Sequence, residues 1–144
     1  MATASSPSND DVDAHDGGEA RVLIIDDEPE ILRAFARMLR TCDVRCAEGG
    51  REGLEVLQDT DDFDVVVLDL MMPDVDGERV LQWMRDHAPH LVGKVLLITA
   101  GAFTQRSQAF LSTWAGDVLE KPIAVSTMRK KVQKVLRRQG KVVA

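Results

Sequence analysis

Short runs of branched apolar residues recur along the chain, and a polar or charged residue follows each run. The central run covers residues 65–68, Val-Val-Val-Leu, and Asp69 follows it directly. Four consecutive apolar residues between chain breakers are too few for a helix and are typical of a strand buried on both faces of a parallel sheet. Related patterns predict four further strands, at residues 21–25, 43–46, 95–98 and 117–120.

The segments between these strands repeat apolar residues every three or four positions, as the buried face of an amphipathic helix does. They predict helices at residues 29–40, 51–57 and 77–86, around Phe110 and Leu111, and at residues 124–138. Strands and helices therefore alternate, with short connections. This alternation predicts an α/β fold in which right-handed crossovers give a parallel sheet with helices on both faces.

The polar residues at the strand ends carry the candidate chemistry. Asp26 and Asp27 follow the first strand, Asp69 ends the central one, and Thr99 and Lys121 follow the last two. The carboxyl ends of parallel strands meet at one edge of the sheet, where open α/β sheets bind their ligands, so we expect these five side chains to converge. Taken singly, each also has an ordinary explanation, as a helix N-cap, a strand-end residue or a solvated charge.

Three carboxylates at one edge repel one another, which raises their pKa values unless a cation compensates the charge. Mg²⁺ prefers oxygen ligands, keeps several of its waters and needs only one or two carboxylates. An ammonium and a hydroxyl group can contact the oxygens of a phosphoryl group. The set therefore predicts phosphoryl transfer to Asp69, with a metal among the acids and with Thr99 and Lys121 beside the transferred group.

This pattern resembles the receiver domain of response regulators in bacterial two-component systems, over residues 21–138. The resemblance implies a flavodoxin-like, doubly wound (βα)5 fold with a five-stranded parallel sheet. It also implies the strand order 2-1-3-4-5, for which flavodoxin and a chemotaxis receiver protein are the standard examples. Residues 101–104 and 120–122 are similar to those of receivers attached to hybrid histidine kinases.

The resemblance also implies a role for each strand-end residue. Asp69 would be the phosphoacceptor, Thr99 the switch hydroxyl, and Lys121 the lysine that contacts the phosphoryl group. The implied ligands of Mg²⁺, or of Mn²⁺ in its place, are Asp26, Asp27, Asp69 and the backbone carbonyl of Met71. Such a domain is a signalling phosphoacceptor that catalyses only its own phosphorylation and dephosphorylation.

The partners implied by the resemblance are proteins. A histidine kinase or a phosphotransfer protein would supply the phosphoryl group, and the surface of the last two helices and the last strand would switch toward a downstream protein target. Phosphorylation-dependent homodimerisation remains open. The sequence after residue 138 is too short for a DNA-binding output domain, so no direct contact with nucleic acid is expected.

One position departs from the commonest receiver pattern. Receivers usually carry an aromatic residue three positions before the lysine, and its ring turns inward when the hydroxyl group moves; here that residue is Val118. Phe103 and Trp114 are candidates to replace the missing ring. Simple core packing explains both aromatic residues equally well.

Composition and charge fit one domain. The chain has 144 residues, 44% of them hydrophobic, and a net charge of −6. Residues 1–20 hold five acids and neither Lys nor Arg, which leaves 19 acids against 18 bases in the remainder. We expect residues 1–20 to be a disordered acidic tail, residues 21–138 the domain, and residues 139–144 a short C-terminal tail. No signal peptide or membrane span is evident, so a cytoplasmic location is expected.

Other chemistry receives little support. Cys42 and Cys46 have poor zinc spacing and are expected to be small, partly buried thiols. His87 and His90 fall in a turn predicted to lie far from the strand ends.

Two rival functions remain: a receiver fold kept as a binding module without phosphorylation, and an aspartate-nucleophile phosphohydrolase. The second rival needs another acid two positions after Asp69, where the chain has Met71.

Overall fold

The computed structural model describes residues 19–101 and 104–141. Strands and helices alternate along the chain, as predicted. The strands are β1 (Arg21–Asp26), β2 (Asp43–Glu48), β3 (Val65–Asp69), β4 (Val95–Thr99) and β5 (Asp117–Glu120). The helices are α1 (Pro29–Met38), α2 (Gly50–Asp59), α3 (Gly77–His87), the 3₁₀ helix η3 (Pro89–Lys94), α4 (Gln105–Thr113) and α5 (Val125–Arg138).

The five strands form one parallel sheet in the order β2-β1-β3-β4-β5, which confirms the predicted order. All five residues of β3 and all five of β4 are buried, because these strands lie inside the sheet with helices on both faces. In the register, Val67 pairs with Ile24 of β1 and with Leu96 of β4. Asp69 pairs with Ile98, so β3 and β4 end at nearly the same level.

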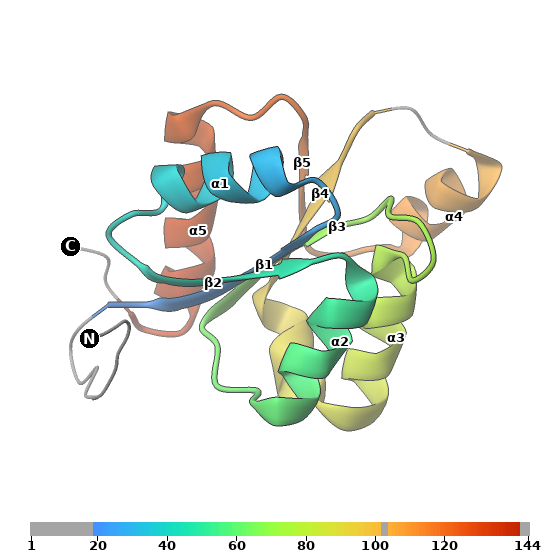
Figure 1. The fold of residues 1–144 in the computed structure, drawn as a ribbon, viewed down its shortest axis with the longest axis horizontal. Helices are drawn as coiled ribbons and strands as arrows, with labels where there is room; N and C mark the ends of the chain where they lie inside the picture. The colour runs from blue at the N-terminus through green and yellow to red at the C-terminus, as the bar shows by residue number, and fades with distance from the viewer. Residues whose placement is uncertain (1–18, 102–103, 142–144) are drawn as a thin grey trace.

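Two apolar cores lie on opposite faces of the sheet. One contains residues of α1 and α5, among them Phe35 and Val132, and the other contains residues of α2, α3 and α4, among them Met84 and Phe110. In Figure 1, α1 lies above the sheet and α2 and α3 lie below it. None of the helices in the described ranges is long and apolar enough to cross a membrane.

The structure differs from the sequence prediction mainly at the ends of elements. Strand β2 continues to Glu48, and α2 covers Gly50–Asp59 instead of residues 51–57. The 3₁₀ helix at Pro89–Lys94 was not predicted, since only Leu91 of its six residues is buried and its sequence lacks a clear periodicity. Phe110 is buried as predicted, while Leu111 is only partly buried.

The predictions for the two cysteines and the two histidines are partly confirmed. Cys42 is buried, but Cys46 is exposed on the edge strand β2, so only one thiol behaves as expected. His87 and His90 are exposed; His87 stacks on Trp83, and His90 lies 3.3 Å from a carboxylate oxygen of Asp61. The predicted disordered tail falls largely on residues 1–18, outside the described residues.

Candidate functional site

The strand-end residues do converge at the carboxyl edge of the sheet. Asp26 is the last residue of β1, Asp69 the last of β3 and Thr99 the last of β4, and Lys121 follows β5 directly. The exposed fractions of Asp26, Thr99 and Asp69 are only 1%, 2% and 3%. Apolar strands thus deliver three buried polar side chains to the carboxyl edge of the sheet.

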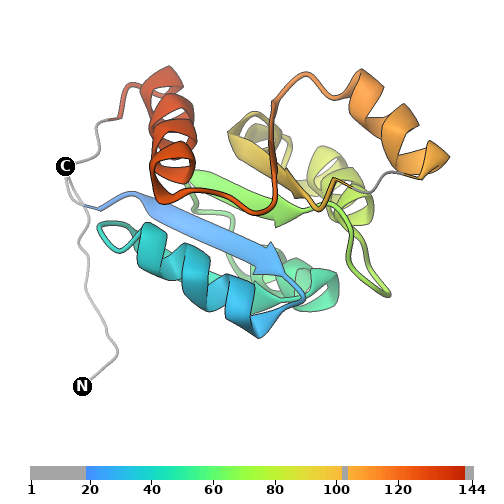
Figure 2. The same ribbon diagram turned by 90° about the horizontal axis from the view of Figure 1, so that it is seen from above.

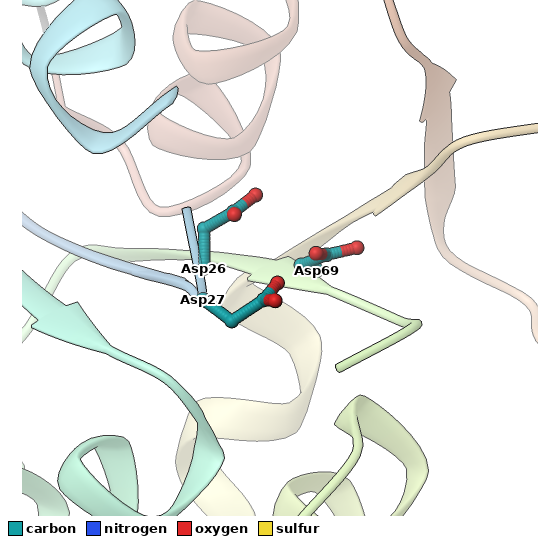
Figure 3. Close-up of side chains that lie close together, drawn as sticks. All are labelled: Asp26, Asp27 and Asp69. Carbon is teal, nitrogen blue, oxygen red and sulfur yellow. The ribbon is translucent and has the colours of Figure 1, made fainter. Parts of the chain in front are cut away.

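Three carboxylates form the centre of the site. One carboxylate oxygen each from Asp26, Asp27 and Asp69 lies within 4.8 Å of the others. Figure 3 shows that the three side chains project from two neighbouring strand ends into the same space. Backbone N–H groups stabilise two of them: Glu28 N donates to Asp26 Oδ1 at 2.9 Å, and Met71 N donates to Asp69 Oδ1 at 3.2 Å.

Lys121 brings the compensating positive charge. Its Nζ lies 2.9 Å from Asp26 Oδ2, 3.4 Å from Asp69 Oδ2 and 3.9 Å from Glu28 Oε1. The backbone fixes this position, because Lys121 N donates to Thr99 O at 2.7 Å and so extends the pairing of β5 with β4. A cis peptide bond joins Lys121 to Pro122.

Burial and charge together raise the pKa values of both the acid and the base of the site. Burial, reinforced by the nearby Asp26 carboxylate, raises the pKa of Asp69 to about 7, although Lys121 and the Met71 N–H oppose the shift. Burial lowers the pKa of Lys121, but the close ion pair with Asp26 and the charges of Asp69 and Asp26 outweigh it, and the net shift is upward. The lysine therefore stays charged, while the ionised form of Asp69 is disfavoured.

The donor set fits a hard divalent cation. Asp26 Oδ2 is buried and accepts no hydrogen bond of good geometry from the described residues, although Lys121 forms an ion pair with it. Clustered carboxylate oxygens with spare acceptor capacity are the ligands that Mg²⁺ and Mn²⁺ prefer. Asp26, Asp27 and Asp69 could therefore hold such an ion. Met71 lies two residues beyond Asp69, with 42% of its surface exposed at the mouth of the site.

Thr99 shares the edge, and among the described residues no hydrogen bond joins its hydroxyl group to the carboxylates. Its Oγ1 accepts a hydrogen bond from Gly101 N at 3.3 Å, at the turn where β4 leaves the sheet. Val118 is exposed, so it does not fill the place of an inward aromatic ring. Trp114 packs on Phe110, with ring centroids 6.3 Å apart, which is ordinary core packing. Phe103 lies outside the described residues.

Two further residues shape the site. Glu28 lies near Lys121 and donates its backbone N–H to Asp26, a role that its place after two aspartates could have suggested. At Gly77 a Cβ would lie 2.5 Å from Asp69 O and 2.8 Å from Leu70 Cα. A glycine is therefore required where the loop after β3 returns to start α3, and sequence alone shows only that this glycine is a chain breaker.

Comparisons with known proteins agree with this geometry. Residues 22–133 match the family described as the response regulator receiver domain. The regulatory protein AtoC of Escherichia coli is 35% identical over 124 residues, which are 83% of this chain and 26% of that protein. The response regulator MprA of Mycolicibacterium vanbaalenii is 33% identical over 120 residues, 82% of this chain and 51% of that protein. The chain thus spans about half or less of the length of these relatives.

Solved structures show the same fold. The response regulator TrrA of Thermotoga maritima, in complex with Mg(2+)-BeF, is 30% identical with a TM-score of 0.68, covering 81% of this chain and 99% of that one. Chemotaxis protein CheY4 of Vibrio cholerae is 28% identical with a TM-score of 0.71, covering 83% of this chain and all of that one, 100%. With the family match covering most of its length, the chain belongs to the response regulator receiver domain family.

Proposed function

We propose that this domain accepts a phosphoryl group on Asp69 from a phosphohistidine of a histidine kinase or phosphotransfer protein. The observation that carries the proposal is the convergence of Asp69, two further carboxylates and Lys121 at one edge of the sheet. A phosphoacceptor role is general for the family. It follows that this chain is a signalling component, with its own phosphorylation and dephosphorylation as its only reactions.

The residues would divide the work as follows. An oxygen of the Asp69 carboxylate attacks phosphorus in line; a P–O bond forms, and the P–N bond to the donor imidazole breaks. Lys121 neutralises an oxygen of the transferred group, and the Thr99 hydroxyl donates a hydrogen bond to another after releasing Gly101 N. Mg²⁺ or Mn²⁺, when bound by the carboxylates of Asp26, Asp27 and Asp69 and the carbonyl of Met71, supplies charge neutralisation.

The absence of a histidine from the described site is compatible with phosphoryl transfer to Asp69, because this reaction needs little help from a general base. Phosphoryl transfer depends mainly on positioning and electrostatic stabilisation. Both described histidines, His87 and His90, are exposed and have partners away from the site. The site residues present are those that such a reaction uses: a nucleophile, two further acids and a cation.

The experiment is phosphorylation by acetyl phosphate in the presence of Mg²⁺, followed by intact mass spectrometry. We expect a mass gain of one phosphoryl group in the wild type and none in Asp69→Asn. The matched control is Asp74→Asn, because Asp74 is an aspartate of the loop after β3 whose carboxylate pairs with Arg51 at 2.6 Å. No gain in the wild type, or an undiminished gain in Asp69→Asn, would overturn the proposal.

Two further assays separate the proposal from its two rivals. A binding module without phosphorylation predicts that beryllofluoride with Mg²⁺ leaves the amide spectrum unchanged, whereas our proposal predicts shifts around Thr99 and in α4, β5 and α5. A phosphohydrolase predicts steady release of phosphate from a generic phosphate ester. Met71 occupies the position where that chemistry needs a second acid, so we expect release at the background rate.

The partner and its setting belong to the same proposal. The phosphate adds about −1.5 to −2 charges at pH 7, and contacts to Thr99 and Lys121 would transmit the change to α4, β5 and α5, whose surface would meet a downstream protein. We place the reaction in the cytoplasm, where a kinase could reach the exposed mouth of the site. The similarity of residues 101–104 to receivers of hybrid histidine kinases suggests a phosphorelay.

A further inference from the structure

Helices α1 and α5 together carry an excess of positive charge. The sequence of α5 contains six Lys or Arg residues and no acid, and α1 contains a single acid, Glu30. The exposed cations of this layer that no carboxylate in the described ranges pairs with are Arg33, Arg37, Arg40, Arg129, Lys130 and Arg137. We call these six residues the basic α1–α5 surface.

The other three cations of α5 have a local partner. Asp117 lies 3.5 Å from Lys131 Nζ, 3.0 Å from Lys134 Nζ and 3.1 Å from Arg138 Nη2. Of the basic α1–α5 surface, Arg129 donates only to the carbonyl of Met38, at 2.9 Å, which joins the two helices side by side. The charges of this surface are therefore uncompensated within the described part of the chain.

The complementary charge is present in the same polypeptide. Residues 10–19 include five acids and neither Lys nor Arg; these acids are Asp10, Asp11, Asp13, Asp16 and Glu19. They account for −5 of the net charge of −6. An acidic segment without Lys or Arg and the basic α1–α5 surface thus belong to the same chain, and the segment ends just before β1.

The structure also shows where this segment joins the domain. Asp64 Oδ2 accepts from Arg21 N at 2.8 Å, and Asp64 O accepts from Gln139 Nε2 at 2.8 Å, so one residue connects the start of β1 with the end of α5. Figure 2 shows the start of β1 and the end of α5 on the same side of the molecule. The described start of β1, which closely follows the acidic segment in the sequence, is therefore close to the end of α5.

We propose that the acidic segment, residues 10–19, docks in cis on the basic α1–α5 surface. Ten residues of polar chain span roughly 17 Å root-mean-square, and the 14 residues of α5 are about 21 Å long. The segment therefore reaches most of the helix. A short tether gives an effective concentration in the millimolar range, so individually weak exposed ion pairs suffice for docking.

The experiment compares amide and arginine Nε–Hε NMR spectra of the full chain and of a variant with the tail neutralised, Asp10→Asn/Asp11→Asn/Asp13→Asn/Asp16→Asn. In low salt we expect shifts at Arg37, Lys130, Arg137 and their neighbours. Adding about 0.5 M NaCl should move the wild-type signals to the variant positions, because the screening length falls to about 4 Å. The control variant neutralises exposed acids of α2 and α3: Glu55→Gln/Asp59→Asn/Asp86→Asn.

Three results would overturn the proposal. The first is a spectrum in which the signals of the basic α1–α5 surface coincide in the wild type and the tail-neutralised variant at low salt. The second is an equal effect from the control variant. The third is shifts that grow with protein concentration, which would mean contact between copies. A second variant, Lys130→Glu/Arg137→Glu, changes exposed residues only and should reproduce the low-salt change independently.

Discussion

The strongest prediction from the site concerns stability, because a carboxylate whose pKa is about 7 destabilises the fold whenever it is ionised. The ordinary pKa of the group is 3.8, so the folded protein binds a proton on Asp69 in a pH range in which the unfolded chain has released it. A raised acid pKa therefore removes stability as the pH rises from about 4 to about 7, and the loss is complete above 7.

The magnitude follows from the size of this shift. About three pKa units at 1.36 kcal/mol each give an upper limit of about 4 kcal/mol above pH 7. Because Asp69 is only 3% exposed, solvent screening reduces this limit little. Allowing for local relaxation, we expect Asp69→Asn to raise the free energy of unfolding by roughly 2 to 4 kcal/mol at pH 8 and by about 1 kcal/mol at pH 5.

Urea denaturation of both proteins at pH 5 and pH 8, with a chelator present, measures this difference directly. The control is Asp59→Asn, a change of an exposed carboxylate at the end of α2, which should shift the free energy of unfolding by less than about 0.5 kcal/mol at either pH. The reasoning fails if the stabilisation by Asp69→Asn is the same at pH 5 and pH 8, or if the variant is less stable at pH 8.

Three further predictions follow from the described contacts. Gly77→Ala should cost about 1 to 3 kcal/mol in thermal unfolding, because its Cβ would meet Asp69 O at 2.5 Å; a gain in Tm would contradict the close approach. Asp117→Asn should cost about 1 kcal/mol at pH 7 and less at pH 3 in urea titrations, because three cationic partners outweigh the effect of burial and lower the pKa of Asp117, and this stabilisation is lost as the pH falls. Mg²⁺ at ten times its Kd should stabilise the wild type by about 1.4 kcal/mol, and Asp26→Asn should lose most of that increase; equal gains in both would place the ion elsewhere.

The parts of the fold that the sequence predicted are those in which the burial of apolar side chains decides the structure. Strand β3 is apolar until Asp69 and buried throughout, so its pattern had one interpretation. The 3₁₀ helix Pro89–Lys94 follows from local hydrogen bonds such as Leu91 N to Ala88 O, at 2.9 Å, which hydrophobic periodicity does not encode. Helix ends were predicted only to within a few residues. Their exact positions depend on backbone angles at the caps, such as the φ of 101° at Gly49, which hydrophobic periodicity does not indicate.

At the candidate site, the sequence predicted where the side chains lie but not which hydrogen bonds and ion pairs they form. Strand ends placed Asp26, Asp69, Thr99 and Lys121 at one edge, and the structure confirms that convergence. Sequence could not show that Thr99 Oγ1 accepts a hydrogen bond from Gly101 N, since that depends on the geometry of a turn. Nor could it show the ion pair of Lys121 with Asp26, because only the backbone bond from Lys121 N to Thr99 O fixes where the lysine lies.

The raised pKa values of Asp69 and Lys121 both reflect incomplete compensation of negative charge at the site. Lys121 is the only described cation within 4 Å of the three carboxylates, so one positive charge faces up to three negative ones. Full compensation by a second lysine would lower the pKa of Asp69 and stabilise the fold, but it would also occupy the space among the acids. The large apolar cores on both faces of the sheet carry the stability instead. The residual negative charge at the carboxyl edge therefore remains available to a divalent cation.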